Sequence, residues 1–220
     1  MRAALFRDRS DAGRQLAARL SAYAASRDVV VLALPRGGVP VAAEVASRLG
    51  APLDVFLVRK LGVPGHAELA MGAIAEGGVQ VLSDDLIAEL EIPAALVSQV
   101  AARERIEMDR RDRLYRAGRP IAEVEGRLVI LVDDGLATGS TMQAAATALR
   151  KRSPARIVVA APVGARETCL RLGGFADEVV CLATPDPFQA VGLWYEEFSQ
   201  TSDDEVGRLL AAGRGSPGTP

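Results

Sequence analysis

Several residue types are scarce in this sequence, and each scarcity argues against a class of protein. The chain has two cysteines, Cys169 and Cys181, without a CxxC spacing or a third thiol, so a zinc site and a disulfide framework are both unexpected. No apolar run approaches the roughly 18 residues that cross a bilayer, and no long apolar stretch of a signal peptide opens the chain. We expect a cytoplasmic protein with reduced thiols and no membrane contact.

An excess of positive charge is also missing. Lysine and arginine number 26 against 28 aspartates and glutamates, which gives a net charge of −2 and no general attraction for nucleic acid. The arginine-rich segment 103–116 does not change this, because its opposite charges recur four positions apart, as on a self-paired, solvated helix face. Any anion that binds must therefore be held by a local arrangement of groups.

Apolar residues, at 49%, are present in the amount and order that an α/β domain needs. Continuous apolar runs at 28–35 and 52–58 are typical of strands buried on both faces, and the helical pattern between them predicts a parallel pair with a crossover. The predicted strands are 28–35, 52–58, 127–132, 156–161 and 178–182, and the predicted helices are 10–25 (capped by Ser10 or Asp11), 40–49, 141–151 and 165–172. This order predicts a doubly wound, mostly parallel sheet.

The segment from about 61 to 126 interrupts this order. Residues 70–82 predict a hairpin that turns at Glu76-Gly77-Gly78, and helices are predicted at 83–91 and 93–116. We interpret the segment as an insertion into a single domain of residues 1–212. The Gly-, Pro- and Ser-rich residues 213–220 predict a disordered tail.

Three loops should share the edge of the sheet where ligands of such folds bind, since each follows a predicted strand: 35–40, 59–68 and 133–141. In the last of them, "DDGLATGST", Gly135 and Gly139 permit unusual backbone conformations, while Thr138, Ser140 and Thr141 offer hydroxyl groups. Successive amide groups at the start of the following helix would form a nest for an anion such as a phosphate. The lysine and the spacing of a Walker A loop are missing.

Two adjacent acids precede this nest. Asp133 and Asp134 would repel a phosphate that touched them, so they should face hydroxyl groups or a metal ion. A ribose 5-phosphate meets both requirements, with its phosphate in the nest and its 2′- and 3′-hydroxyls on the acids. The alternative is that the two acids only end a strand and cap a turn.

The string "VILVDDGLATGSTM" resembles the phosphoribosyl diphosphate (PRPP) motif of the type I phosphoribosyltransferases, and the resemblance covers the core from about Asp28 to Leu182. It implies Mg²⁺ as a cofactor, which the two acids would serve indirectly, through PRPP or water. It also implies that PRPP is bound by the whole segment, namely Asp133, Asp134, Gly135, Leu136, Ala137, Thr138, Gly139, Ser140 and Thr141.

The resemblance also implies roles for the other two loops. The family has a pyrophosphate loop, often with a strained peptide, at the position where this chain has Arg36, Gly37 and Gly38. Arg36 would neutralise the leaving diphosphate. The family has a basic residue, sometimes contributed across a dimer interface, at the position of Arg59 and Lys60. The alternatives are an ordinary tight turn at 35–40 and a solvated basic pair at a strand end.

The single histidine, His66, could act as a general base. However, the segment resembles a subgroup with the pattern "RKLGxPGNPELAIG", in which asparagine is common at this position. We therefore expect His66 to be a loop residue and Glu68 to be the better candidate for a function.

The family resemblance limits the set of possible acceptor bases only by excluding some of them. Members that act on 6-oxopurines carry a third acid three residues after the second, where this chain has Ala137. This departure argues against hypoxanthine, guanine and xanthine, and it leaves adenine-, uracil- and orotate-type acceptors open. A small C-terminal hood at about 183–200 supplies Phe188, Trp194 and Tyr195, which could stack on a base, although a packed cover is the alternative. The hood sequence faintly resembles the oxopurine pattern, which conflicts with the exclusion.

We therefore expect a Mg²⁺-dependent phosphoribosyltransferase, a pentosyl-type glycosyltransferase of nucleotide metabolism or base salvage. It would move the 5-phosphoribosyl group of PRPP to a nitrogenous base or related amine and release diphosphate without a covalent nucleophile. Catalysis would depend on Asp133, Asp134, Arg36 and Lys60. A non-catalytic PRPP-binding regulator and a different phosphosugar enzyme are the alternatives, and family analogy suggests a homodimer.

Overall fold

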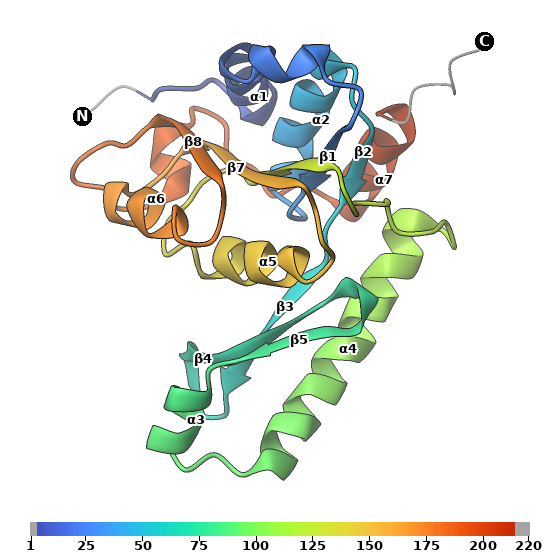
Figure 1. Ribbon diagram of the computed structural model, residues 1–220. Coiled ribbons are helices and arrows are strands. Elements are labelled where there is room, and N and C mark those ends of the chain that lie inside the picture. Colours follow the sequence, from blue (N-terminus) through green and yellow to red (C-terminus); the bar gives the residue numbers. More distant parts are fainter. Residues whose placement is uncertain (1–3, 214–220) are drawn as a thin grey trace.

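The computed structural model describes residues 4–213, and the side chains of all of these except Ala25, Ala67 and Glu68. Its centre is a five-stranded parallel sheet in the order β2-β1-β6-β7-β8, with helices on both faces (Figure 1). The strands are β1 (Val29–Ala33), β2 (Leu53–Val55), β6 (Leu128–Val132), β7 (Arg156–Val163) and β8 (Glu178–Ala183). The predicted doubly wound, mostly parallel α/β fold is confirmed.

The apolar strand sequences follow from burial on both faces of this sheet. In β1, Val29, Val31 and Ala33 pack on one side, and Val30 and Leu32 pack on the other. The first side is covered by α1 (Arg9–Arg19), α2 (Gly38–Leu49) and α7 (Asp203–Ala212), and the second by α5 (Ser140–Arg150) and α6 (Arg166–Leu172). Because neither face meets water, the strand has no polar alternation.

The direction of winding reverses between β1 and β6. From β1 the chain crosses through α2 to β2 at one edge, whereas from β6 it crosses through α5 and α6 toward β8 at the other edge. The loops that follow β1 and β6 therefore diverge to opposite faces of the sheet. Ligands of doubly wound sheets bind at such a switch point, in the crevice outside the carboxyl ends of the two strands.

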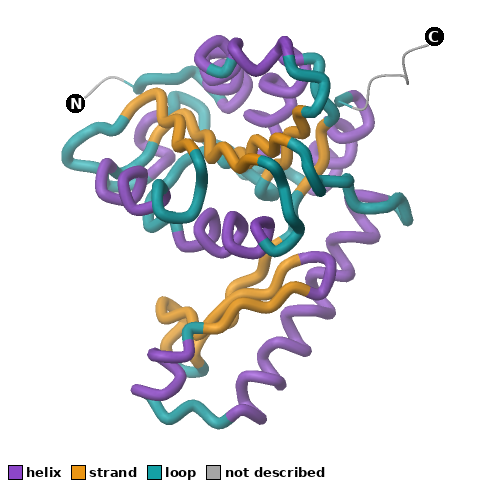
Figure 2. Tube along the Cα trace, in the orientation of Figure 1, coloured by secondary structure: helices purple, strands orange, loops and turns teal. Residues whose placement is uncertain are grey.

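The insertion forms a separate antiparallel sheet of β3 (Val58–Val63), β4 (His66–Ala75) and β5 (Val79–Leu82), with a short 3-10 turn, η2 (Glu76–Gly78), between the last two. Two helices follow, α3 (Asp84–Glu89) and α4 (Ala94–Arg116). Figure 2 shows this sheet beneath α5, with α4 running alongside it. The predicted hairpin with its turn at 76–78 and the two predicted helices are confirmed.

Two predictions for this region are wrong. The expected strand at 52–58 is divided, because β2 ends at Val55 and β3 begins at Val58 in the other sheet. The expected loop at 59–68 is itself a hairpin, whose turn needs only Pro64 and Gly65. The glycines and proline that suggested a loop are accommodated by a register shift around Gly62, while Leu61 and Val63 are buried.

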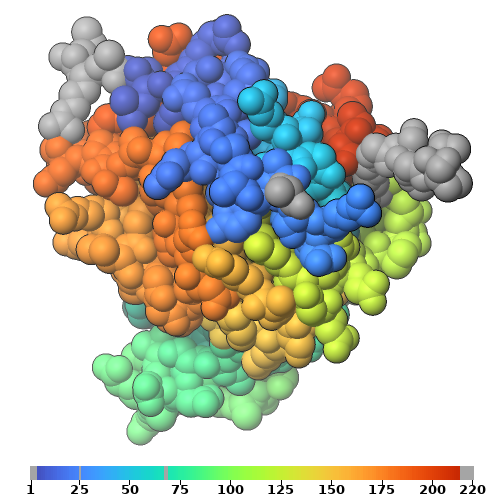
Figure 3. All heavy atoms as spheres, turned by 45° about the horizontal axis from the view of Figure 1, so that its top comes forward, coloured from blue at the N-terminus to red at the C-terminus, as the bar shows by residue number. Residues whose placement is uncertain are grey.

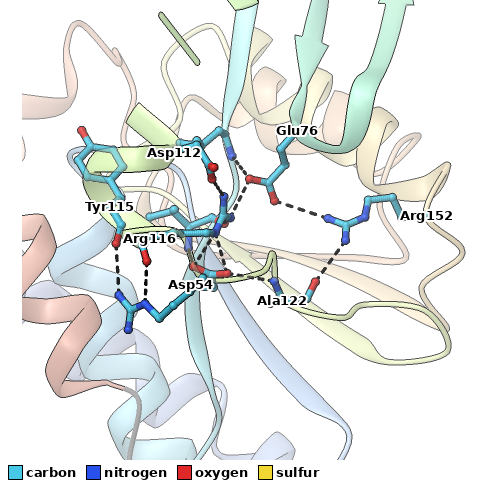
Figure 4. A network of polar contacts seen from close by, with 10 residues as sticks. Asp54, Glu76, Asp112, Tyr115, Arg116, Ala122 and Arg152 are labelled. Carbon is cyan, nitrogen blue, oxygen red and sulfur yellow. Dashed lines mark hydrogen bonds and ion pairs between the residues drawn. The ribbon is translucent and has the colours of Figure 1, made fainter. Parts of the chain in front are cut away.

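A buried arginine joins the insertion to the central sheet (Figure 4). Arg116, at the end of α4, is 0% exposed, and its guanidinium donates to the carboxylates of Asp54 in β2 and Glu76 in η2. It also pairs with Asp112 and donates to the carbonyl oxygen of Val55 at 2.6 Å. Because three elements share this one cation, the network fixes the orientation of the insertion.

The segment before α1 pairs with the segment between β8 and α7. Residues after β8, which include η3 (Val191–Trp194), pair with the N-terminal segment through a parallel bridge between Phe6 and Tyr195. Figure 3 shows the blue N-terminal segment and the orange segment side by side on one surface, whereas the green insertion projects away. Of the predicted tail, only Gly213 lies among the described residues, and the single domain of 1–212 stays a prediction.

The N-terminal helix differs from its prediction. Helix α1 begins at Arg9, and its cap is Asp8, whose carboxylate accepts from the amide of Asp11 at 2.7 Å. The predicted caps, Ser10 and Asp11, are thus already helical, and the pattern that extended to residue 25 continues as a 3-10 turn, η1 (Ser21–Ala25). Within residues 4–213, no helix combines the length and apolar character that crossing a bilayer requires.

Candidate functional site

Two loops meet in the crevice at the switch point. A Cβ added to Gly37 would lie 2.1 Å from Oδ2 of Asp134, and one added to Gly38 would lie 2.7 Å from the carbonyl oxygen of Val132 and 2.9 Å from Cα of Asp133. Only glycine allows the two loops to approach so closely. The Pro35–Arg36 peptide, where the resemblance implied an unusual peptide, is cis.

The two predicted acids lie together at the carboxyl end of β6. The amide of Asp134 donates to Oδ1 of Asp133 at 2.9 Å, which orients the first carboxyl group along the loop. Burial raises the pKa of Asp133 well above its ordinary value, and the neighbouring charge of Asp134 raises it further. Both effects disfavour the charged form, so the carboxyl groups need a compensating partner to remain ionised acceptors.

Asp134 already has such a partner. Burial raises its pKa, and the guanidinium of Arg9, whose Nε donates to Oδ2 at 2.8 Å, opposes that rise. The hydroxyl of Tyr195 donates to the main-chain carbonyl of Asp134 at 2.6 Å. Sequence reasoning did not find Arg9, because an arginine near the start of a helix has no feature that links it to a motif 125 residues away.

The loop after the acids presents unpaired amide groups. Within the described chain, the amides of Gly135, Ala137, Thr138 and Gly139 have no protein acceptor. Gly139 caps α5 in the left-handed conformation, with φ of 68°, so the amides meet at a helix N-terminus. This arrangement of free N–H groups is a nest that suits an anion.

Side chains of helix α6 support this loop through hydrogen bonds to its main chain. The hydroxyl of Thr168 donates to the carbonyl oxygen of Ala137 at 2.6 Å, and the guanidinium of Arg171 donates to that of Thr138. A Cβ on Gly139 would lie 2.4 Å from Cγ2 of Thr168, so the loop and the helix are in direct contact. Sequence reasoning also missed these two supports, since they act on main-chain atoms.

The three predicted basic residues have different surroundings. Arg36 forms an ion pair with Asp203 at 3.7 Å, and Arg59 forms one with Glu104 at 2.6 Å. Lys60 is exposed and has no ion pair within the described residues. It lines a hollow of about 910 Å³ that also includes Pro35 and Thr141, and a second one of about 450 Å³ against Ser140 and Gln143 of α5. Lys60 is thus the cation best placed to receive a ligand.

The hood aromatics lie mostly inside the protein. Trp194 and Tyr195 are 7% and 5% exposed and pack with Phe6, while Phe188 is partly buried against the same cluster. This arrangement matches the packed cover that was the alternative for this region. His66 is exposed at the start of β4, and the side chain of Glu68 lies outside the described residues.

Metal binding by side chains alone is not apparent. No group of three or more His, Cys, Asp or Glu side chains in the described ranges could hold a metal ion. Asp133 and Asp134 nevertheless offer the one or two carboxylates that Mg²⁺ takes from proteins when substrate phosphates and water complete its shell. The donor set therefore fits Mg²⁺ that arrives with a phosphorylated ligand.

Known proteins resemble this chain in sequence and in fold. Residues 6–193 match the family of the phosphoribosyl transferase domain. Proteins of two Mycobacterium tuberculosis strains, provisionally named phosphoribosyl transferases, are 54% identical over 206 residues, which cover 94% of this chain; the chain spans about half, 46%, of their length. A Thermus thermophilus crystal structure has 45% identity and a TM-score of 0.85, covering 96% of this chain and 99% of that one.

A shorter stretch of the chain is similar to a different enzyme. A ribose-phosphate pyrophosphokinase of Methanopyrus kandleri is 39% identical over 75 residues, which are 32% of this chain and 26% of that protein. The match of the family to most of the chain agrees with the parallel sheet, the crevice and the acid pair. The chain belongs to the phosphoribosyl transferase domain family.

Proposed function

We propose that this protein transfers the 5-phosphoribosyl group of PRPP to a nitrogenous acceptor and releases diphosphate, with Mg²⁺ bound alongside PRPP. The observation that carries the proposal is the juxtaposition in one crevice of an acid pair, four unpaired amides and the glycine loop after β1. Each part suits a different portion of one phosphosugar. The short match to a ribose-phosphate pyrophosphokinase agrees with such a ligand.

The phosphate and the ribose would occupy adjacent parts of the loop after β6. The four unpaired amides of this loop and the N-terminus of α5 would hold the 5-phosphate, because both present N–H groups to an anion. The carboxyl groups of Asp133 and Asp134 would accept hydrogen bonds from the two ribose hydroxyls. This separation keeps the acids away from the phosphate, which they would repel.

The diphosphate would lie along the loop that contains Gly37 and Gly38. Lys60, exposed in the hollow beside Pro35, and Arg36 would supply positive charge, and Arg36 would have to exchange its 3.7 Å ion pair with Asp203 for the ligand. Bound Mg²⁺ would neutralise charge on the diphosphate oxygens. The cations of this chain would thereby stabilise the leaving group as its bond to C1 breaks.

The reaction needs few groups beyond these. The bond between C1 of the ribose and the diphosphate oxygen breaks, and its electron pair leaves with the diphosphate. The acceptor nitrogen forms the new bond to C1 with its lone pair, and any proton that this nitrogen carries passes to the solvent. The protein holds the sugar and the acceptor together and stabilises the separated charge. No nucleophilic side chain is required for this displacement.

The acceptor is proposed to be outside the 6-oxopurines. The side chain of Ala137 is exposed and is only a methyl group, so this position offers no carboxylate to a purine ring. Adenine-, uracil- and orotate-type bases therefore remain the acceptors to test.

Titration calorimetry with PRPP and Mg²⁺ tests the proposal. Wild-type protein should bind PRPP, and Asp133→Asn and Asp134→Asn should each weaken binding about 10- to 100-fold, because each loses a charged hydrogen-bond acceptor. Asp85→Asn, which changes an exposed acid of α3, is the matched control and should bind normally. Unchanged affinity in both site variants would refute the assignment, whereas tight binding without turnover on any base would favour a regulator.

A further inference from the structure

The first residue of α1 reaches into the candidate sugar site. Arg9 donates through Nε to Oδ2 of Asp134 at 2.8 Å, and the two side chains are only 12% and 15% exposed. Nothing in the loop motif or in the family resemblance assigns a role to this arginine. Its contact is with one of the two carboxyl groups that would bind the ribose.

Other contacts hold the Arg9 side chain in this position. A terminal nitrogen, Nη1, donates to the carbonyl oxygen of Ser199 at 2.6 Å, and Cζ lies 3.9 Å from the centre of the Phe198 ring. A cation over an aromatic face is attracted to it, and the flat ring also limits rotation of the guanidinium. Arg9 is therefore held at two points apart from its bond to Asp134.

Main-chain pairing joins the segments that carry these residues. The amide of Phe6 donates to Trp194, the amide of Glu196 donates back to Phe6 at 2.9 Å, and the amide of Glu197 donates to Arg7 at 2.8 Å. The N-terminal segment and the residues after η3 are thus paired through their main chains, and the blue and orange surfaces are adjacent in Figure 3.

The consequence for Asp134 is a fixed orientation. Oδ2 is bound by Arg9, the main-chain carbonyl is bound by Tyr195, and Gly37 packs directly on the carboxylate. The other oxygen, Oδ1, is not bound by Arg9, and the carboxyl group of Asp133 is a hydrogen-bonding neighbour of the Asp134 side chain. A carboxylate that is oriented before the ligand arrives needs no rearrangement on binding.

We infer that Arg9 is a positioning residue of the sugar site, which holds the carboxyl group of Asp134 in the rotation that lets its Oδ1 accept a ribose hydroxyl. The inference rests on the proposed function, because it assumes that Asp134 binds the sugar. It makes the N-terminal segment part of the active centre, although the segment lies outside the PRPP motif.

Three variants separate positioning from general packing. Arg9→Met keeps much of the side-chain volume but loses the charge, and should weaken PRPP binding about 10- to 100-fold in titration calorimetry. Arg9→Lys keeps a cation and should recover part of this loss. Arg14→Met on the same helix removes a partly exposed ion pair with Glu44 and should bind PRPP like wild type. Equal losses in Arg9→Lys and Arg9→Met would overturn the inference.

A double-mutant cycle tests whether the effect of Arg9 on PRPP binding depends on Asp134. In the Asp134→Asn background, Arg9→Met should cause less than about a threefold further loss of PRPP affinity, because its target is already gone. If the losses of PRPP affinity in the two single variants add fully in the double variant, Arg9 acts only on the packing of the N-terminal segment against the residues after η3. That result would overturn the inference. If Arg9→Met does not fold, Phe198→Leu can replace it, because this change removes the ring beneath the Arg9 guanidinium. Phe198→Leu should weaken PRPP binding in the wild-type background and should have little effect on PRPP binding in the Asp134→Asn background. A wild-type protein that does not bind PRPP would instead refute the proposed function itself.

Discussion

Gly37 lies directly against the carboxylate of Asp134. A Cβ on this glycine would stand 2.1 Å from Oδ2 and 2.6 Å from Cγ of the aspartate, distances that no side chain can tolerate. The backbone of Gly37 is helical, with φ of −59° and ψ of −35°, so its conformation alone does not require glycine. The requirement comes from the contact between the loops after β1 and β6, and this contact defines the floor of the crevice.

Gly37→Ala should therefore damage the site without straining the backbone. The new methyl group displaces a carboxylate that Arg9 holds, so we expect at least tenfold weaker PRPP binding and a loss of about 1–3 kcal/mol in the free energy of unfolding. Gly207→Ala is the control, because a Cβ there meets nothing within 4 Å inside α7 and should stabilise by about 0.5–1 kcal/mol. Normal PRPP affinity in Gly37→Ala, measured by calorimetry, would contradict the close packing of the two loops.

The support of the phosphate loop by α6 can be tested with a nearly isosteric change. Thr168→Val removes the hydroxyl that donates to the carbonyl oxygen of Ala137 at 2.6 Å. The loop amides should then be less well aligned, and PRPP affinity should fall about 3- to 10-fold, since one neutral hydrogen bond is lost. Thr147→Val removes a hydroxyl bonded within α5, away from the loop, and should leave affinity unchanged. Equal effects of the two variants would show that the bond from Thr168 is unimportant.

The network around Arg116 should contribute strongly to stability (Figure 4). Arg116→Met leaves the carboxylates of Asp54 and Glu76 buried without their cation, so we expect a loss of about 3–5 kcal/mol in urea denaturation. Arg110→Met removes an exposed ion pair with Glu107 on the same helix and should change stability little. A similarly small effect of Arg116→Met would mean that the insertion is held by apolar packing alone.

The same network predicts a pH dependence. Burial raises the pKa of Glu76 from 4.5 to about 7, although the charge of Arg116 opposes the rise. The folded state therefore binds this proton more tightly than the unfolded state, and the resulting stability is present below pH 4.5 and lost as pH rises through 7. Relative to Glu76→Gln, the free energy of unfolding of the wild type should fall between about pH 5 and 8, as urea titrations at several pH values can measure. Parallel profiles of the two proteins would contradict the raised pKa.

Local sequence was sufficient for the parts of the fold that depend on local pattern. The apolar runs at 28–35 and 127–132 predict strands because a strand buried on both faces has only apolar residues. The string 133–141 predicts a turn into a helix, and the structure has α5 beginning at Ser140. Hydrophobic order and glycine placement carry this information within about ten residues.

Contacts between distant residues could not be predicted in the same way. The bond from Arg9 to Asp134 joins residues that are 125 positions apart, and the burial of Trp194 depends on Phe6 from the N-terminal segment. In the segment 59–68, the glycines and the proline indicate a loop and outweigh the alternating apolar residues. Only the pairing with β4 reveals that these residues form a strand. The sequence thus predicts the loops that form the candidate site. The residues that support these loops, such as Arg9, lie in elements that carry no recognisable motif.

The most direct test is the release of diphosphate from PRPP in the presence of Mg²⁺ and a panel of bases. We predict that an adenine-, uracil- or orotate-type base promotes release and that hypoxanthine, guanine and xanthine do not. We also predict that Asp133→Asn and Asp134→Asn reduce the rate at least 100-fold, since the site would lose ribose contacts. Release that depends on a 6-oxopurine would contradict the acceptor proposal, and release that is undiminished in both aspartate variants would contradict the placement of PRPP in this crevice.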